Sequence, residues 1–243
     1  IQWFLDRMDE KWKVNKKRFL DKIEYIDCSF CTTDPGILNI NKKHKIFFIP
    51  NPLDPSLDNL KIFNNLSFEN DVFFAMSHGV HRGTLKKGKL DKREDFIKEL
   101  IKKTPGIKFD IYGVDNKQPV WAEKFKESLS KSKMGINLSQ GSSSKYYSSD
   151  RIAQLMGNGV LTFIDKKTKL NHFFKNNEAI FYNSINDLSK KIYYFSKNDA
   201  LRKKISKNGR LKYHKYFNNL LISKYMISKC FNLYNKENFI WEK

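Results

Sequence analysis

Short apolar runs alternate with amphipathic stretches along most of the chain. From Asp71 onward the apolar runs recur roughly every 25 residues and are rich in β-branched and aromatic residues, as in buried strands. The stretches between them have apolar residues at helical spacing. Strands that alternate with helices favour right-handed βαβ units and a parallel sheet. The predicted strands are DVFFAMS, KFDIYG, MGINLS, GVLTFID and EAIFYN, and the predicted helices are KREDFIKELIKK, VWAEKFKESLSK, SSDRIAQLM, KLNHFFKN and INDLSKKIYYFS.

The same pattern divides the chain into parts. Residues 1–53 alternate strand and helix but hold too few strands for a complete domain, which predicts a partial N-terminal α/β domain. Residues 54–70 begin within a cluster of Pro, Asp and Asn that breaks regular structure, and we interpret them as a linker. Residues 71–217 predict a doubly wound parallel-sheet, Rossmann-like domain. A long helical tail is expected from about Asp199 to Asn235.

Composition is typical of a folded chain, with 40% hydrophobic and 14% aromatic residues. No window approaches the roughly 18 consecutive apolar residues of a membrane-spanning helix. The chain opens on Ile1 rather than Met, so we expect it to start inside a longer reading frame or after processing. Cys28, Cys31 and Cys230 form neither a disulfide framework nor a zinc site. Cys28 and Cys31 lie in an apolar run and predict two buried strand thiols, in keeping with a reducing cytoplasm.

The net charge of +20 comes mainly from lysine, because only seven of the 46 basic residues are arginine. A lysine-rich surface is usually solvated, yet a field this positive attracts anions, and peripheral contact with an anionic membrane is the main alternative. Nucleic-acid binding is less favoured. Arginine would be expected for bidentate phosphate and base contacts, and the aromatic residues follow core patterns.

In a doubly wound sheet, ligands bind beyond the carboxyl ends of the strands. The first such loop, SHGVHRGTLKKG, brings His78, Gly79, Arg82 and Lys87 together, which favours diphosphate binding over a solvated surface turn. It lacks the Lys-Ser/Thr pair of a nucleotide triphosphate P-loop. Gly113 ends the second strand, where it either permits close packing of a base or ribose or forms a simple turn.

The third strand leads into a helix start at SSDRIAQ. Ser148 or Ser149 is the predicted N-cap, with Asp150 in the first turn. Arg151 is unfavourable beside a helix N-terminus, so either an anionic ligand or a carboxylate partner is expected to offset its charge. Gln154 lies one turn further on the same face, where it can hydrogen-bond a ribose or sugar hydroxyl.

The stretch from SDRIAQLMGNG to RLKYHKYF resembles the C-terminal half of GT-B-type glycosyltransferases, most closely the group-1-related branch that includes spore-maturation-protein-like enzymes. Its matching positions are Arg151, Gln154, Gly157 or Gly159, Asp165, the strand around Phe181, Asp187-Leu188 and Gly209-Arg210. The upstream HRGTLKKG is similar to the Gly-Arg-Leu-x3-Lys-Gly loop of these enzymes. Together the matches cover about residues 71–217.

The resemblance implies two Rossmann-like domains facing a cleft, with a nucleoside-diphosphate sugar on the C-terminal one and the acceptor on the N-terminal one. It places Arg82 and Lys87 on the diphosphate and the Ser149–Gln154 helix start on the phosphates, ribose or sugar. It also implies that residues 218–243 form a helix crossing back to the first domain. Such enzymes usually act without metal or other cofactor, because basic residues stabilise the departing diphosphate.

Two features depart from the family pattern. Gln154 stands where these enzymes often have Glu, which removes the carboxylate expected to hold the donor. The first domain is also short, so no catalytic base is assigned. The sequence thus predicts a cytoplasmic glycosyltransferase, peripheral at the inner membrane surface, that extends a glycan or lipid-linked acceptor. The alternatives are a non-catalytic nucleotide- or sugar-binding module and a basic nucleic-acid-binding protein.

Overall fold

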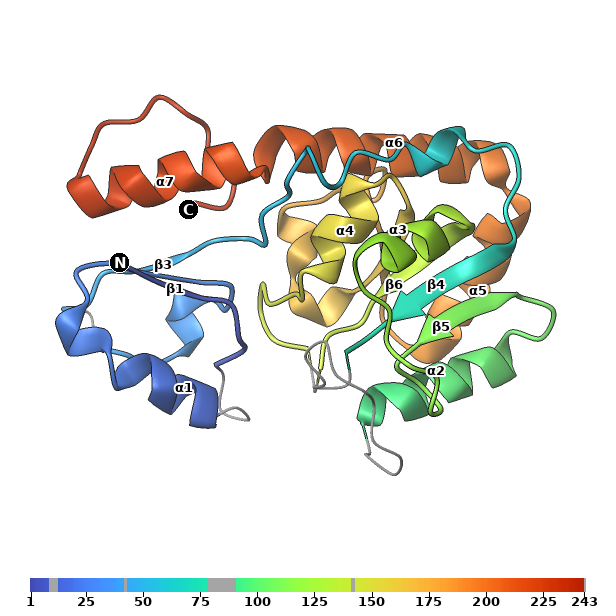
Figure 1. The fold of residues 1–243 in the computed structure, drawn as a ribbon, viewed down its shortest axis with the longest axis horizontal. Coiled ribbons are helices and arrows are strands. Elements are labelled where there is room, and N and C mark those ends of the chain that lie inside the picture. The colour runs from blue at the N-terminus through green and yellow to red at the C-terminus, as the bar shows by residue number, and fades with distance from the viewer. Residues whose placement is uncertain (9–12, 42, 78–90, 141–142, 243) are drawn as a thin grey trace.

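The computed structural model describes residues 1–8, 13–41, 43–77, 91–140 and 143–242. Within these residues the chain forms two separate parallel sheets, ordered β1-β2-β3 and β5-β4-β6-β7-β8 (Figure 1). The strands of the first are β1 Gln2–Phe4, β2 Ser29–Cys31 and β3 Ile46–Phe48. Those of the second are β4 Asn70–Ala75, β5 Phe109–Tyr112, β6 Ser132–Asn137, β7 Leu161–Asp165 and β8 Ile180–Tyr182. The predicted α/β class with parallel sheets is confirmed.

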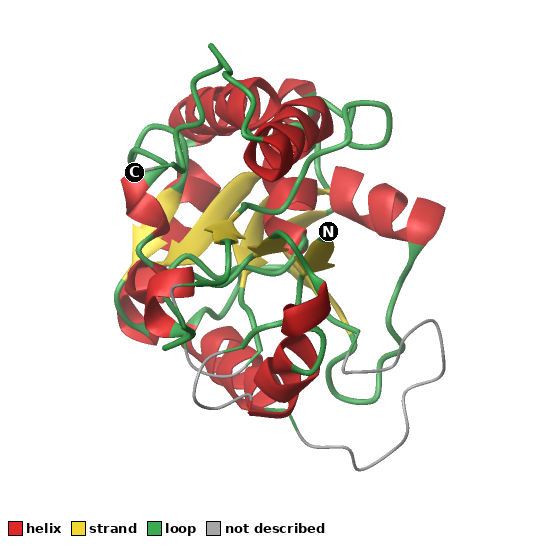
Figure 2. Cartoon of the chain, turned by 90° about the vertical axis from the view of Figure 1, so that its left-hand side faces the viewer, coloured by secondary structure: helices red, strands yellow, loops and turns green. Residues whose placement is uncertain are grey.

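Helices cover both faces of the larger sheet, which lies as a central layer in Figure 2. Side chains alternate along β4: Phe74 packs with the apolar faces of α2 and α5, while Phe73 packs with those of α3 and α4. This explains the nearly continuous apolar strands, which bury both faces. The helices are α2 Lys92–Lys103, α3 Ala122–Ser130, α4 Arg151–Gly157, α5 Ile185–Lys197 and α6 Asp199–Tyr216.

The smaller sheet packs between α1 (Lys13–Leu20) and α7 (Asn219–Phe231). Phe19 of α1 lies in one apolar cluster with Cys31, whereas Phe30 points to the other face. There the ring of Tyr225 from α7 meets Phe30 edge to face, with centroids 6.3 Å apart. The C-terminal helix therefore covers strands from the first fifty residues (Figure 1).

The long helical tail was predicted wrongly as one element, because it is broken between α6 and α7. Phe217 leaves the helix, and Asn218 starts the next one by accepting a hydrogen bond from the backbone of Leu221 at 2.8 Å. Leu53 pairs with the break, donating to the carbonyl of Phe217 and accepting from the N–H of Asn219, both at 2.8 Å. This backbone pairing cannot be read from helical periodicity.

Two further helix predictions need correction. KLNHFFKN holds only a single 3-10 turn, Leu170–His172, and the segment beyond it packs Phe173 and Phe174 into the core. At α4 neither Ser148 nor Ser149 is the N-cap, since the helix begins after Asp150, whose side chain forms no capping bond. The two serines are engaged elsewhere, as described below.

The segment of residues 54–70 packs closely on the larger sheet's helices. Asn158, which follows α4, accepts from the backbone N–H of Leu60 at 3.1 Å through its side chain. Its carbonyl accepts from Ile62 at 3.1 Å. Arg210 of α6 donates to the carbonyl of Leu60 at 3.0 Å. These contacts fix the segment beside α4, where Asp58 enters the site.

Candidate functional site

A cavity of about 540 Å³ opens at the carboxyl ends of β4 and β6. The chain leaves β4 to form β5 on one side and then β6 on the other, so this point is the topological switch of the sheet. Side chains from several elements and loops line the cavity, among them Met76, Arg93, Trp121, Asp150, Arg151 and Gln154. The volume is within the usual range for a small-molecule site.

Arg151 bridges the two strand ends below this cavity. Its Nε donates to the carbonyl of Ala75 at 2.7 Å, and its Nη1 donates to the carbonyl of Leu138 at 2.9 Å. The side chain is buried, and its guanidinium carbon lies 5.0 Å from the centre of the Phe74 ring. Among the described residues no carboxylate forms an ion pair with it, which contradicts the carboxylate-pair alternative for this residue.

Keeping Arg151 charged in this buried position is therefore energetically unfavourable. Burial lowers its pKa to about 10, and the nearby positive charge of Arg93 acts in the same direction. The guanidinium stays protonated at neutral pH, because about 10 is still well above it. An anion in the cavity would offset both the lost solvation and the repulsion.

Arg93 supplies the second buried guanidinium of the cavity. It lies in the first turn of α2, where Asp91 caps the helix through the N–H of Arg93 at 2.9 Å. Asp91 also accepts from the Arg93 guanidinium at both oxygens, at 3.0 and 2.7 Å. This fork holds the arginine in place. Sequence reasoning missed Arg93, because the pattern DKRED looked like an ordinary polar helix start.

The serines before α4 build the wall beside Arg151. Ser149 Oγ accepts from Arg151 Nη1 at 3.1 Å, and its N–H donates to Ser139 Oγ at 3.1 Å. Ser148 Oγ is buried against the side chain of Asn137, with contacts of 2.9 and 3.1 Å. Because the hydroxyls of Ser148 and Ser149 hydrogen-bond to Asn137 and Arg151, they do not cap the helix as predicted.

The structure brings four predicted residues, Ser149, Asp150, Arg151 and Gln154, to one cavity. Gly113 is placed differently. Its φ is +73°, and an added Cβ would lie 2.0 Å from the carbonyl oxygen of Met76. Its small size is thus required by the neighbouring strand end, which agrees with the turn alternative. His78, Gly79, Arg82 and Lys87 lie outside the described residues.

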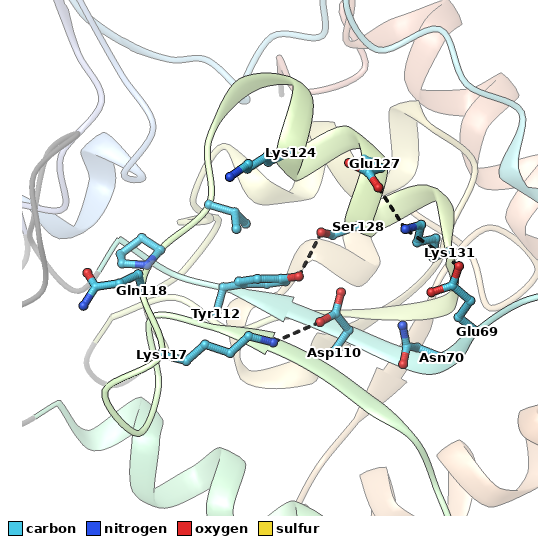
Figure 3. A pocket seen from close by; sticks show the side chains of 12 residues that line it. Glu69, Asn70, Asp110, Tyr112, Lys117, Gln118, Lys124, Glu127, Ser128 and Lys131 are labelled. Atoms are coloured by element: carbon cyan, nitrogen blue, oxygen red, sulfur yellow. Dashed lines mark hydrogen bonds and ion pairs between the residues drawn. The ribbon is translucent and has the colours of Figure 1, made fainter.

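A second cavity, of about 510 Å³, lies beside the edge strand β5 (Figure 3). Its charged side chains pair with one another: Lys117 contacts Asp110 at 3.2 Å, and Lys131 contacts Glu127 at 2.9 Å. Lys117 also lies 4.0 Å from the centre of the Tyr112 ring. The two cavities have similar volumes, but of the two, the cavity at the switch point is the one lined by buried guanidiniums.

Residues 92–220 match the family of glycosyl transferase-like proteins. The chain belongs to this family. It is also similar in fold to solved GT-B glycosyltransferases. HepE from Anabaena in complex with UDP-glucose matches with a TM-score of 0.65 at 11% identity, over 95% of this chain and 71% of that one. TarM from S. aureus, in complex with UDP, fondaparinux and alpha-GlcNAc-glycerol, matches with a TM-score of 0.62 at 16% identity, over 99% of this chain.

This glycosyl transferase-like chain spans about half the length of the TarM chain, of which 50% is covered. Sucrose-phosphate synthase from Thermosynechococcus elongatus matches with a TM-score of 0.60 at 15% identity, over 90% of this chain and 61% of that one. A comparison with curated protein sequences found no match. The predicted spore-maturation-like branch stays a prediction.

Proposed function

We propose that the chain binds a nucleoside-diphosphate sugar in the cavity at the switch point and takes part in glycosyl transfer. The observation that carries this proposal is the buried guanidinium of Arg151, which has no carboxylate partner among the described residues and lines that cavity with Arg93. Arg151 supplies a positive charge without a carboxylate partner, and Arg93, although paired with Asp91, adds a second fixed guanidinium; such groups suit a diphosphate, which carries charge on several oxygens.

The same cations give the site its proposed chemistry. Negative charge develops on the diphosphate as the bond to the sugar breaks, and cations already fixed in a desolvated site stabilise it without rearranging. Arg151 is held by two strand carbonyls and Arg93 by Asp91, so neither has to be ordered on binding. In this proposal the reaction needs no metal. Arg82 and Lys87 of the preceding loop are proposed to add to the same charge.

The ligands of structural neighbours support a nucleotide donor. HepE was solved with UDP-glucose and with UDP and glucose, and TarM with UDP. The proposed acceptor is a glycan or a lipid-linked saccharide, in line with the alpha-GlcNAc-glycerol present in the TarM complex. A non-catalytic sugar-nucleotide-binding module is the second candidate, and transfer of sugar by the chain would exclude it.

Nucleoside diphosphates are expected to raise the thermal stability of the protein. We expect one of UDP, GDP, ADP or dTDP, at one hundred times its dissociation constant, to add about 2.7 kcal/mol to the free energy of unfolding. Differential scanning fluorimetry with each nucleotide measures this shift and identifies the base. A protein that responds to none of them lacks the proposed site.

Arg93→Gln tests whether the shift comes from this cavity. We expect this variant to lose most of the stabilisation, because it removes a guanidinium from the cavity and leaves the negative charge of Asp91 unpaired near the diphosphate. Lys98→Ala is the matched control, since Lys98 lies on the same helix with its side chain half exposed and paired to Asp115. Equal responses of the two variants would place the nucleotide elsewhere.

We also propose a cytoplasmic location at the surface of an anionic membrane. The outer face of α7 exposes Leu220, Ile227 and Phe231 at helical spacing, with Lys224 between them. Lys224 is paired with Glu237 at 2.8 Å, so the exposed apolar side chains and the net charge of +20 carry the proposed attraction to an anionic bilayer. None of the helices in the described residues is long and apolar enough to span a membrane.

Vesicle binding tests this surface. The protein is expected to sediment with phosphatidylglycerol vesicles but not with phosphatidylcholine vesicles, and to be released as salt rises. Ile227→Glu with Phe231→Glu should weaken binding at least about tenfold, because burying apolar side chains contributes about 1.5–3 kcal/mol each. Equal binding of this double variant and the unchanged protein would rule out α7 as the docking face.

A further inference from the structure

Asp58 brings a carboxylate into the cavity at the switch point. It belongs to the segment between the two sheets, and it lines the cavity together with Arg151 and Gln154. One amide nitrogen, Nδ2 of Asn158, donates to Asp58 Oδ1 at 2.9 Å and to the backbone carbonyl of Gln154 at 2.8 Å. Asp58 therefore lies beside the helix turn that carries Gln154.

The charge of Asp58 is unfavourable in the fold. Burial raises the pKa of its carboxyl above the usual value, and this effect outweighs the hydrogen bond from Asn158 and the charge of Lys126. Within the described part of the chain it forms no ion pair. A neutral side chain would accept the bond from Asn158 as well, so packing alone does not require the carboxylate.

Asp58 lies beside the C-terminal end of α4, whereas Arg151 lies at its N-terminal end. Asn158 follows Arg151 by seven residues, which corresponds to about 10 Å along a helix. A nucleoside diphosphate with its phosphates at Arg151 would have to span about this distance, past Gln154, for its ribose to reach Asp58. Carboxylates accept strong hydrogen bonds from hydroxyls, and a ribose presents two neighbouring hydroxyls.

We infer that Asp58 binds the ribose hydroxyls of the donor nucleotide and supplies the carboxylate that Gln154 does not provide. This inference rests on the proposed function, because it assumes that the nucleotide occupies this cavity. It makes Asp58 a specificity-determining residue that selects ribonucleotides over their 2′-deoxy forms. It also assigns a ligand contact to a segment that the sequence pattern marks as a linker.

The test compares UDP, GDP and ADP, each with its 2′-deoxy counterpart, by isothermal titration calorimetry. The unchanged protein is expected to bind the preferred ribonucleotide about tenfold to a hundredfold more tightly than the deoxy form, as for one hydrogen bond to a charged group. Asp58→Ala should bind both forms with nearly equal affinity. Its affinity for the deoxy form should fall less than its affinity for the ribonucleotide, because only the contact with the 3′-hydroxyl is lost there.

Glu123→Ala is the matched control, because Glu123 lines the same cavity with a side chain that is 89% exposed. It removes the same charge and should keep the preference for ribose. Asp58→Asn should unfold at higher urea concentration than the unchanged protein yet discriminate less between the two sugars, a combination that a structural role would not give. A preference that survives in Asp58→Ala overturns the inference alone, whereas a protein that binds no nucleoside diphosphate overturns the proposed function as well.

Discussion

Arg151→Ala is expected to abolish measurable nucleotide binding and to destabilise the fold. The substitution removes a fixed charge from the cavity, and truncating one partner of a buried charge pair costs about 2–5 kcal/mol, or at least about thirtyfold in affinity. It also leaves the carbonyls of Ala75 and Leu138 without the donors that join β4 to β6. Each buried unpaired group costs about 1–3 kcal/mol.

Affinity and stability have to be measured separately for this variant. Urea unfolding followed by circular dichroism gives the free energy of unfolding, and calorimetry well below the transition gives the dissociation constant. Arg151→Lys keeps the charge but cannot reach both strand carbonyls, so it should restore part of the binding and little of the stability. If Arg151→Ala binds nucleotide normally, the guanidinium serves only to join the strands.

Lys117→Ala is the control for the choice of cavity. Lys117 lies in the cavity beside β5, where it is paired with Asp110 and stacked on Tyr112. Its loss should leave nucleotide affinity unchanged within twofold. A large loss in Lys117→Ala, with normal binding in Arg151→Ala, would move the donor from the switch point to the cavity of Figure 3.

Gly113→Ala is expected to lower the free energy of unfolding by roughly 2–5 kcal/mol. An alanine at a φ of +73° costs about 1–2 kcal/mol. The added Cβ would also lie 2.0 Å from the backbone oxygen of Met76, which cannot move without shifting the end of β4. Forcing an atom into a packed region costs about 1–3 kcal/mol more. Because Met76 lines the cavity, nucleotide affinity should fall as well.

Gly106→Ala separates the cost of the backbone conformation from the cost of the contact with Met76. Gly106 has a φ of +85° but no atom within 4 Å of an added Cβ, so it should lose only the conformational part, about 1–2 kcal/mol. Urea unfolding of both variants measures the difference. If Gly113→Ala lowers the free energy of unfolding no more than Gly106→Ala does, the end of β4 at Met76 moves aside to accommodate the added Cβ.

The sequence by itself determined the alternation of strands and helices. Apolar runs such as the one around Phe73 and Phe74 need cover on both faces, and periodicity shows this locally. KREDFIKELIKK was predicted residue for residue as α2, because Asp91 caps it and its apolar spacing is regular. Arg151 was singled out from the sequence because a cation at a helix start is unfavourable there. These properties depend on neighbours along the chain.

Tertiary structure alone decided what surrounds those residues. Periodicity did not show that Leu53 would interrupt the last helix by pairing with Phe217 and Asn219, because backbone pairing between distant segments leaves no local pattern. Nor did it show that Arg151 would donate to strand carbonyls rather than to a carboxylate. Arg93 and Asp58 reach the site from a helix start and a presumed linker, 58 and 93 residues before Arg151. Their role follows from the folding of parallel strands, which brings distant loops to one edge of the sheet.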